Sequence, residues 1–241
     1  DYAAIEMLDD YVPAYKAGSG LMSWPEALVR MAKLGKPILI ATGASDMADV
    51  VRAMRAVSEI NDEIVLMQCN TNYTASPENF DHINLRVLET YHAMFPDLIL
   101  GLSDHTFGPA TVLGAVAMGA RVIEKHFTDD NMRVGPDHPF SMTPQTWREM
   151  VDRTRELERA LGNPEKQVME NEEQTVVVQR RCLRASRDIQ PGETFTREMI
   201  AVLRPATPGA IMPNEVDQVL GTRAIGGIPA GKELRWVDLG A

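Results

Sequence analysis

The first part of the chain alternates short apolar runs with longer segments in which apolar residues recur at helical spacing. The apolar runs predict buried β-strands at residues 12–17, 37–41 and 63–68, and from Leu98 and Val122 onward. Between them, apolar residues stand three and four positions apart, as in Met47, Val50 and Met54, which predicts amphipathic helices. Continuous apolar strands covered by such helices are typical of a parallel sheet buried on both faces. The pattern therefore predicts an α/β fold.

The last helix of this part has the clearest boundaries. Thr143 can cap it, Pro144 suits its first turn, and Gly162 suits its end. Residues 164–177 are polar and acidic, which predicts a linker. We therefore expect a first domain over residues 1–163.

After the linker the helical periodicity fades, and short strands alternate with Pro-Gly and Ala-Gly turns. The segment that starts at Ile189 resembles the segment that starts at Ile228, with Gly192 matching Gly231. Two similar halves in a short stretch predict a compact, mostly β module with pseudo-two-fold symmetry. We place this second domain over residues 178–241.

Composition narrows the classes of function. The 241 residues carry a formal net charge of −10, which argues against nucleic-acid binding because that requires a basic surface. A hydrophobic fraction of 44% is ample for a core, and no apolar run approaches the length of a membrane span, so we expect no membrane association. Cys69 and Cys182 are widely separated and suit a reducing compartment such as the cytoplasm. The start at Asp1, without an initiator Met, suggests a fragment or a processed product.

Two histidines follow neighbouring strands of the predicted sheet. His105 comes after the strand that starts at Leu98, and His126 comes after the strand that starts at Val122. Because the carboxyl ends of parallel strands meet at one edge, both imidazoles can reach one divalent ion with positions left for water and substrate. Nitrogen and oxygen ligands fit Mn²⁺ or Zn²⁺. The alternative is that each histidine caps its strand and bonds to the backbone.

Charged residues stand at the same strand ends. Lys16 and Lys125 can each hold a phosphate or a carboxylate, or form a Schiff base if the pKa of the amine is lowered. Glu124 alternates with Lys125 along the strand. We therefore expect Glu124 to face away from the site and to make a salt bridge to the helix layer.

Other polar residues offer weaker signals. Ser19 lies between two glycines and can present a hydroxyl to a phosphate, and Ser103 closes a strand. Tyr73 and Asp137 could hydrogen-bond a polyol, although each taken alone fits an ordinary loop residue better. Arg204 precedes a proline and could be a surface charge.

Several spaced blocks together resemble the sialic acid synthase family, whose members make nonulosonic acids such as N-acetylneuraminate. The barrel-type blocks are residues 15–20, 35–43, 103–106, 124–127 and 135–138, and the tail blocks are residues 188–193 and 203–205. The tail resembles the antifreeze-like SAF domain of that family. The resemblance implies a partial TIM (β/α)8 barrel, beginning near the fourth strand with the N-terminal strands missing from this chain, followed by a small β-clip SAF domain.

The resemblance also implies a reaction. Phosphoenolpyruvate would condense with an N-acylated sugar, such as N-acetylmannosamine or its 6-phosphate, and release phosphate. It implies that His105 and His126 hold a divalent metal, Mn²⁺ or Mg²⁺. It assigns the contacts with phosphoenolpyruvate to Lys16, Ser19 and Ser103.

The remaining implied roles concern the sugar and the assembly. Tyr73 and Asp137 match sugar contacts, and a family asparagine matches Thr71 by spacing, or Asn72 with a slip of one residue. Arg204 matches an arginine of the SAF domain that reaches the active site of the partner subunit. The implied assembly is a domain-swapped homodimer.

Two departures from the family pattern leave alternatives open. Leu21 stands where the family has a carboxylate, so a relative with another sugar acceptor, or a sugar-binding homologue with impaired catalysis, is an alternative. The missing strands would supply further catalytic groups, so we expect this chain by itself to be inactive. A Schiff-base aldolase that uses Lys125 or Lys16 is a third hypothesis.

Overall fold

A computed structural model describes residues 1–240. The chain divides into two compact units, Asp1–Gly162 and a second unit that begins at Asn163. Each unit is described by itself.

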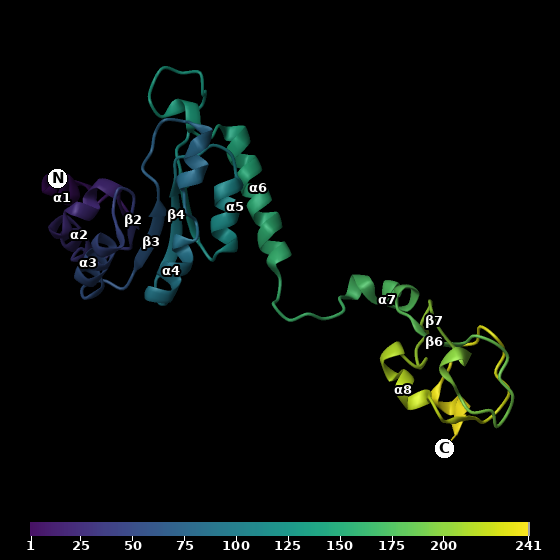
Figure 1. Cartoon of the computed structure of the whole chain (residues 1–241). Helices are drawn as coiled ribbons and strands as arrows, with labels where there is room; N and C mark the ends of the chain where they lie inside the picture. The colour runs from purple at the N-terminus through teal and green to yellow at the C-terminus, as the bar shows by residue number, and fades with distance from the viewer. Residues whose placement is uncertain (241) are drawn as a thin grey trace. The chain divides into compact units, whose positions relative to one another are not determined.

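The first unit is built on a curled parallel sheet (Figure 1). Its strands are β1 (Tyr15–Ala17), β2 (Ile38–Ala41), β3 (Ile64–Cys69), β4 (Ile99–Asp104) and β5 (Val122–Lys125). They follow one another in chain order, and each neighbouring pair is parallel. The predicted α/β fold with a parallel sheet is confirmed.

Helices connect the strands of the first unit. They are α1 (Tyr2–Leu8), α2 (Pro25–Ala32), α3 (Met47–Ser58), α4 (Val87–Met94), α5 (Ala110–Ala117) and α6 (Pro144–Leu161), with short 3-10 turns η1 (Ser19–Ser23), η2 (Pro77–His82) and η3 (His138–Phe140). α2 packs against α3, and α5 lies beside α6 (Figure 1). The Thr143 hydroxyl accepts a hydrogen bond from the amide of Thr146 and so caps α6, which has Pro144 in its first turn and ends at Gly162, as the sequence predicts.

The core of the first unit lies between the sheet and the helices. Because side chains alternate along a strand, every second strand residue joins this core. These residues are Tyr15, Ala17, Ile38, Ile40, Ile64, Leu66, Leu100 and Leu102. They meet buried helix residues such as Leu28, Met54 and Leu88. The other residues of each strand face the opposite side of the sheet, where the polar strand ends begin.

The second unit is a small module of short antiparallel pairs. Its elements are η4 (Glu170–Glu172), α7 (Glu173–Gln179), β6 (Cys182–Ala185), η5 (Arg197–Met199), β7 (Ile200–Leu203), η6 (Pro213–Glu215), α8 (Val216–Val219), β8 (Arg223–Ala224), η7 (Trp236–Asp238) and β9 (Leu239–Gly240). β6 pairs with β7, and β8 pairs with β9. Leu183, Phe195 and Leu234 are buried in its core.

The internal repeat has a structural counterpart in this module. Ile189 and Ile228 pair directly, and each amide donates to the carbonyl of the other at 2.9 Å. Gly192 and Gly231, which match in sequence, adopt φ angles of 79° and 80°. That left-handed conformation favours glycine and accounts for both turns.

Helix α7 lies largely within the stretch that the sequence predicts to be a linker. The carbonyl of Val177 accepts a hydrogen bond of 3.0 Å from the amide of Ala206, so α7 is tied to the second unit. Sequence reasoning missed this helix because it is short and contains consecutive valines, whose helix propensity is low.

Within residues 1–240, none of the helices combines the length and the apolar character that a membrane-spanning segment requires.

Candidate active site

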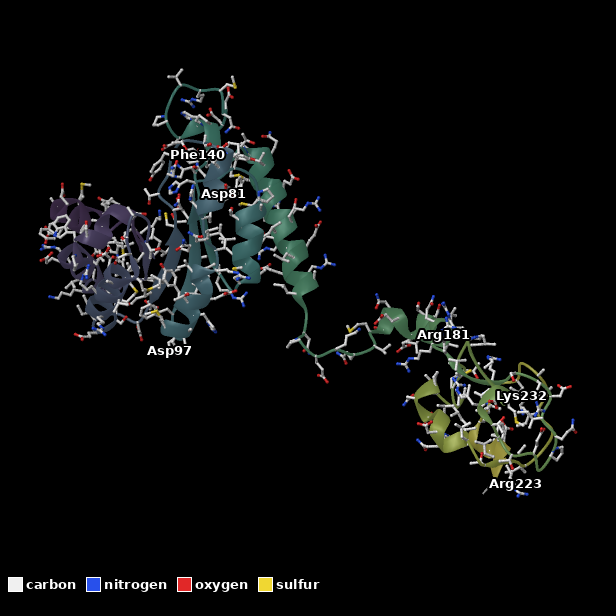
Figure 2. All side chains as sticks on the ribbon, in the orientation of Figure 1. Asp81, Asp97, Phe140, Arg181, Arg223 and Lys232 are labelled. Atoms are coloured by element: carbon white, nitrogen blue, oxygen red, sulfur yellow. The ribbon has the colours of Figure 1, made fainter. Side chains whose placement is uncertain are left out.

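The register of β4 and β5 places two polar strand ends side by side. Ser103 pairs with Glu124, and Asp104 pairs with Lys125. His105 and His126 follow directly, and their ring centroids lie 5.0 Å apart. Figure 2 labels Phe140 at this end of the first unit and Asp97 at the opposite end.

A cation, a hydroxyl and a carboxylate meet on the side of the sheet that faces away from the helices. Lys16 Nζ lies 2.9 Å from Glu124 Oε2 and 3.4 Å from Ser103 Oγ. The Ser103 hydroxyl donates to Glu124 Oε2 at 2.6 Å. We call Lys16, Ser103 and Glu124 the anion corner, because an ammonium and a hydroxyl together suit a phosphate or carboxylate.

The pKa of the Glu124 carboxyl is lowered. Burial by itself would raise this pKa, but the Ser103 hydroxyl and the Lys16 ammonium together outweigh burial. The carboxylate is therefore ionised at neutral pH.

The predicted orientation of Glu124 is wrong, and so is the predicted availability of Lys125. Lys125 points into the helix layer, where its side chain is 1% exposed and its Nζ lies 2.6 Å from Asp104 Oδ2. Glu124 points into the site instead. Since Lys125 is held in a buried ion pair, it does not present a free amine for a Schiff base, and the aldolase hypothesis retains only Lys16.

The two histidines present their rings in a similar way. His105 Nδ1 lies 2.9 Å from the carbonyl oxygen of Asn70, and His126 Nδ1 lies 3.4 Å from Asp137 Oδ2. Metal-binding histidines commonly use one ring nitrogen for such a contact and the other for the ion. The pair of imidazoles therefore fits a metal site, and the contact of His105 with the backbone is compatible with that role.

Within residues 1–240, no group of three or more His, Cys, Asp or Glu side chains is arranged to hold a metal ion. A pair of imidazoles leaves the other coordination positions to oxygen atoms of water or substrate.

The pKa values of the two imidazoles move in opposite directions. Burial lowers the pKa of His105, but Cys69 and the Asn70 carbonyl outweigh burial and raise it overall. Burial and the neighbouring charge of His105 lower the pKa of His126. His126 is accordingly the more readily available as a neutral ligand.

Aromatic rings enclose the histidines. The Tyr73 ring centroid lies 4.5 Å from that of His105 and 5.8 Å from that of His126. Phe140 lies 5.0 Å from His126 by the same measure. Tyr73 is 45% exposed, so its hydroxyl-bearing ring is accessible to a ligand.

Ser19 and Thr71 meet on either side of Cys69. The Ser19 hydroxyl donates to Cys69 Sγ at 3.4 Å, and Thr71 Oγ1 lies 3.7 Å from the same sulfur. A Cβ atom at Gly43 would lie 1.8 Å from Thr71 Oγ1, so only glycine leaves room for this contact. Sequence reasoning missed Cys69 as a site residue, although its place at the end of β3 was the available signal.

The loops supply the other sequence-predicted residues. Asn72 Oδ1 accepts hydrogen bonds from the amide and hydroxyl of Thr74, so Asn72 is engaged in its own turn. Leu21 lies in η1, half-buried, and packs against the core of the first unit. Arg204 belongs to the second unit, where its guanidinium donates to Gln179 Oε1.

The loop after β5 carries Asp137 and closes on itself. The amide of Met142 donates to the carbonyl of His126, and the amide of Thr128 donates to the carbonyl of Met142, both at 2.8 Å. The Asn131 side chain donates to the carbonyl of Ser141 at 2.8 Å inside the loop. The two ends of the loop are therefore tied together beside His126.

The fold and these residues define an α/β protein with a candidate active site at the carboxyl edge of a parallel sheet. Residues 1–166 match the NeuB family, and residues 180–240 match the SAF domain. The chain therefore belongs to the NeuB family and carries a SAF domain. The resemblance that the sequence blocks indicate is confirmed.

Relatives and a solved structure agree with this assignment. The chain is 35% identical over 235 residues to an N,N'-diacetyllegionaminic acid synthase of Legionella pneumophila, covering 95% of this chain and 64% of the relative. It is 33% identical over 226 residues to the N-acetylneuraminate-9-phosphate synthase of Homo sapiens, covering 93% and 62%. The crystal structure of the spore coat polysaccharide biosynthesis protein SpsE of Bacillus subtilis matches with a TM-score of 0.62 at 30% identity, covering 100% of this chain and 72% of that one.

The chain thus spans less than two thirds of the length of these two synthases.

Proposed function

We propose that this chain is part of a nonulosonic acid synthase. The enzyme condenses phosphoenolpyruvate with an N-acylated sugar aldehyde, such as N-acetylmannosamine or its 6-phosphate, and releases phosphate. The observation that carries the proposal is the anion corner beside the His105 and His126 pair at one edge of the sheet. Relatives named as synthases of this kind support the proposal.

The reaction sets clear demands on the site. C3 of phosphoenolpyruvate forms a carbon–carbon bond with the aldehyde carbon, and the aldehyde oxygen takes a proton. The oxygen of a water molecule adds to C2 and loses both its protons as the bond between C2 and the phosphate oxygen breaks. One proton balances the one taken up by the aldehyde oxygen, and the other leaves with the phosphate. The site must therefore bind an anion, polarise an aldehyde and accept a proton.

The anion corner meets two of these demands. Lys16 and Ser103 supply the ammonium and hydroxyl that hold the phosphate or carboxylate of phosphoenolpyruvate, and Ser19 adds a second hydroxyl. Glu124 touches both Lys16 and Ser103 and is ionised, so it is placed to take a proton from the attacking water.

The histidine pair meets the remaining demand, which is to polarise the aldehyde. We propose that His105 and His126 hold Mn²⁺ or Mg²⁺, which when bound would polarise the aldehyde oxygen and orient water. The contact of His126 Nδ1 with Asp137 supports this role, since it leaves the Nε2 atom of that ring to face an ion.

Tyr73, Asp137 and Thr71 form the sugar side of the proposal. Tyr73 offers an exposed ring, and Asp137 is half-exposed next to His126. Leu21 packs against the core and presents no carboxylate, and the missing carboxylate is our reason to propose an altered sugar acceptor. A sugar-binding homologue with impaired catalysis is the second candidate, and the same residue favours it.

The assembly is part of the proposal. We propose that the sheet belongs to a TIM (β/α)8 barrel, because β1 and β5 each have only one neighbouring strand within residues 1–240. We also propose that Arg204 reaches the active site of a partner subunit in a domain-swapped homodimer. The free thiols Cys69 and Cys182 favour a reducing, cytoplasmic compartment.

The deciding experiment measures phosphate release from phosphoenolpyruvate by the complete gene product, with Mn²⁺ and a panel of N-acylated sugars. We expect release with at least one sugar, and none after a chelator is added. Absence of release with every sugar contradicts the synthase proposal. Trapping of pyruvate on Lys16 by borohydride, with turnover that survives the chelator, would favour the aldolase instead.

A further inference from the structure

A fully buried ion pair lies behind the two histidines, on the helix side of the sheet. Its members, Asp104 and Lys125, directly precede His105 and His126 in the chain. Their side chains are 0% and 1% exposed. None of the proposed chemical steps uses either group.

The pair belongs to a closed hydrogen-bond network. Lys125 Nζ donates to Asp104 Oδ2 and to the carbonyl oxygen of Thr106, both at 2.6 Å. The hydroxyl and the amide of Thr106 donate to Asp104 at 2.9–3.1 Å. The Thr111 hydroxyl on α5 donates to Asp104 Oδ2 at 2.6 Å. Both carboxylate oxygens are therefore satisfied, and the network joins β4, β5 and α5.

The network fixes the backbone on both sides of His105. Asp104 and Thr106 are bonded to one another and to Lys125, so His105 lies between two clamped residues. Asp104 and Lys125 are also the last register pair of the two strands. The ion pair thus sets the distance between the ends of β4 and β5, directly before His105 and His126.

Stability by itself is a weak reason for such a pair. Removing two charges from water cancels most of their attraction, and apolar residues of similar size often serve a core equally well. A hydrogen-bonded charge pair differs from apolar residues in its directionality, because it permits only one relative placement of the two strands.

We propose that Asp104 and Lys125 are positioning residues, which set the spacing of the His105 and His126 imidazoles and thereby the affinity of the site for a divalent ion. The inference rests on the proposed function, since that function includes the ion. Contacts one layer behind metal ligands commonly change metal affinity by about 10- to 100-fold when they are removed.

The test measures the dissociation constant for Mn²⁺ of the complete gene product, from the electron paramagnetic resonance signal of the free ion. Lys125→Met and Asp104→Asn are each expected to weaken Mn²⁺ binding by about 10- to 100-fold. The double variant is expected to bind Mn²⁺ no more weakly than the single variant with the lower affinity, because the two residues act as one unit. All measurements are made well below the melting temperature of each variant.

A control variant that lowers the stability of the first unit, but lies outside this network, separates a positioning role from a general loss of stability. Leu28→Ala removes a fully buried side chain of α2, and it is expected to lower the melting temperature without changing Mn²⁺ affinity. Thr111→Val is a milder variant that removes one donor to Asp104 and leaves no charge unpaired. It keeps the test available if Lys125→Met does not fold, and it is expected to weaken Mn²⁺ binding several-fold.

The outcomes distinguish this inference from the proposed function. Wild-type protein that binds no Mn²⁺, or a His105→Ala variant that binds it as tightly as wild type, overturns both. Wild-type binding that depends on His105 but is unchanged in folded Lys125→Met and Thr111→Val overturns the positioning role alone. The positioning role is also overturned if Leu28→Ala weakens Mn²⁺ binding as much as Lys125→Met and Thr111→Val do.

Discussion

Glu124 shows how a single residue joins the two sides of the candidate site. Its carboxylate contacts Lys16 from β1 and Ser103 from β4, although these residues are far apart in sequence. Neither its charge nor its neighbours in the chain single it out, since a glutamate in an edge strand commonly faces solvent. The structure places it in contact with two residues of the proposed phosphoenolpyruvate site, Lys16 and Ser103.

Replacement of Glu124 should therefore affect turnover more than binding. We expect Glu124→Gln to lower kcat of the complete enzyme by about 100-fold or more, because a proton acceptor in the transition state typically contributes at least that much. The KM for phosphoenolpyruvate should change much less, since Lys16 and Ser103 remain. Steady-state phosphate release measures both constants. Glu89→Gln, on the exposed surface of α4, is the matched control and should leave both unchanged.

The same carboxylate predicts a pH dependence of stability. The pKa of Glu124 is below its ordinary value of 4.5 in the folded chain, so its stabilising contribution is complete above that value. The contribution is lost as the pH falls through the lower, folded-state pKa. Urea unfolding of wild type and Glu124→Gln should therefore show a difference in unfolding free energy at pH 7 that shrinks as the pH falls below 4.5. A difference that is constant across this range contradicts the ionic contact with Lys16.

At the scale of elements, the sequence predicts where strands and helices occur better than how they face. The caps of α6 are visible in the residues themselves. β1 begins only at Tyr15 instead of residue 12, because Pro13 has no amide hydrogen to place in a sheet ladder.

The sequence does not predict which residues of β5 face the helices and which face the site, because its apolar residues do not mark one side of the strand. Val122 and Ile123 are adjacent and both apolar, so either alternation fits the sequence. The phase follows from the pairing of Ser103 with Glu124, which is a contact between strands. Local patterns therefore place Glu124 and Lys125 in the strand but cannot assign their faces.

One arginine joins separate elements of the second unit. Arg184 on β6 donates to the carbonyls of Gly231 and Pro205, each at 2.8 Å, and lies 3.6 Å from Glu233. Its side chain is only 17% exposed. These contacts fix the segment that directly follows Arg204.

Loss of these contacts should destabilise the module. We expect Arg184→Met to lower the unfolding free energy of the second unit by about 2 kcal/mol or more, because two charge-assisted hydrogen bonds are lost. Arg187→Met is the control, since its ion pair with Glu193 involves a half-exposed guanidinium and is screened by solvent, so its loss should have a smaller effect. Urea unfolding followed through the fluorescence of Trp236 in η7 reports on this unit when Trp24 and Trp147 of the first unit are replaced by Phe in every variant. Equal effects of the two substitutions would contradict the bridging role.

At the scale of the whole molecule, the two faces of the sheet differ in what covers them. The helix side is closed by the main core. On the other side, Leu39 is half-buried and Ile99 is 50% exposed. An apolar sheet face with open edges usually needs further structure to cover it.

This arrangement predicts a difference between the chain alone and the complete gene product. Residues 1–241 expressed by themselves should release no phosphate from phosphoenolpyruvate and should bind an apolar dye such as ANS strongly. The complete product should show release and weak dye binding. Activity of the isolated chain equal to that of the complete product would contradict a barrel completed by further strands.

The candidate site shows how far motifs can lead. Lys16, Ser103, His105 and His126 were all expected at strand ends, and the parallel sheet places them at one edge. The contact of Cys69 with Ser19 was not expected. It depends on the space left by Gly43, and Ser19, Gly43 and Cys69 are far apart in the sequence.

The tied base of the loop after β5 has a consequence for engineering. Because the hydrogen bonds between His126 and Met142 and between Thr128 and Met142 close the loop next to the sheet, the residues inside it form a cassette with fixed attachment points. Its sequence can be exchanged for that of another family member while the backbone of His126 keeps its place. We therefore expect a library confined to residues 129–141 to vary the proposed sugar side while Lys16, Ser103 and Glu124, the proposed phosphoenolpyruvate side, stay constant.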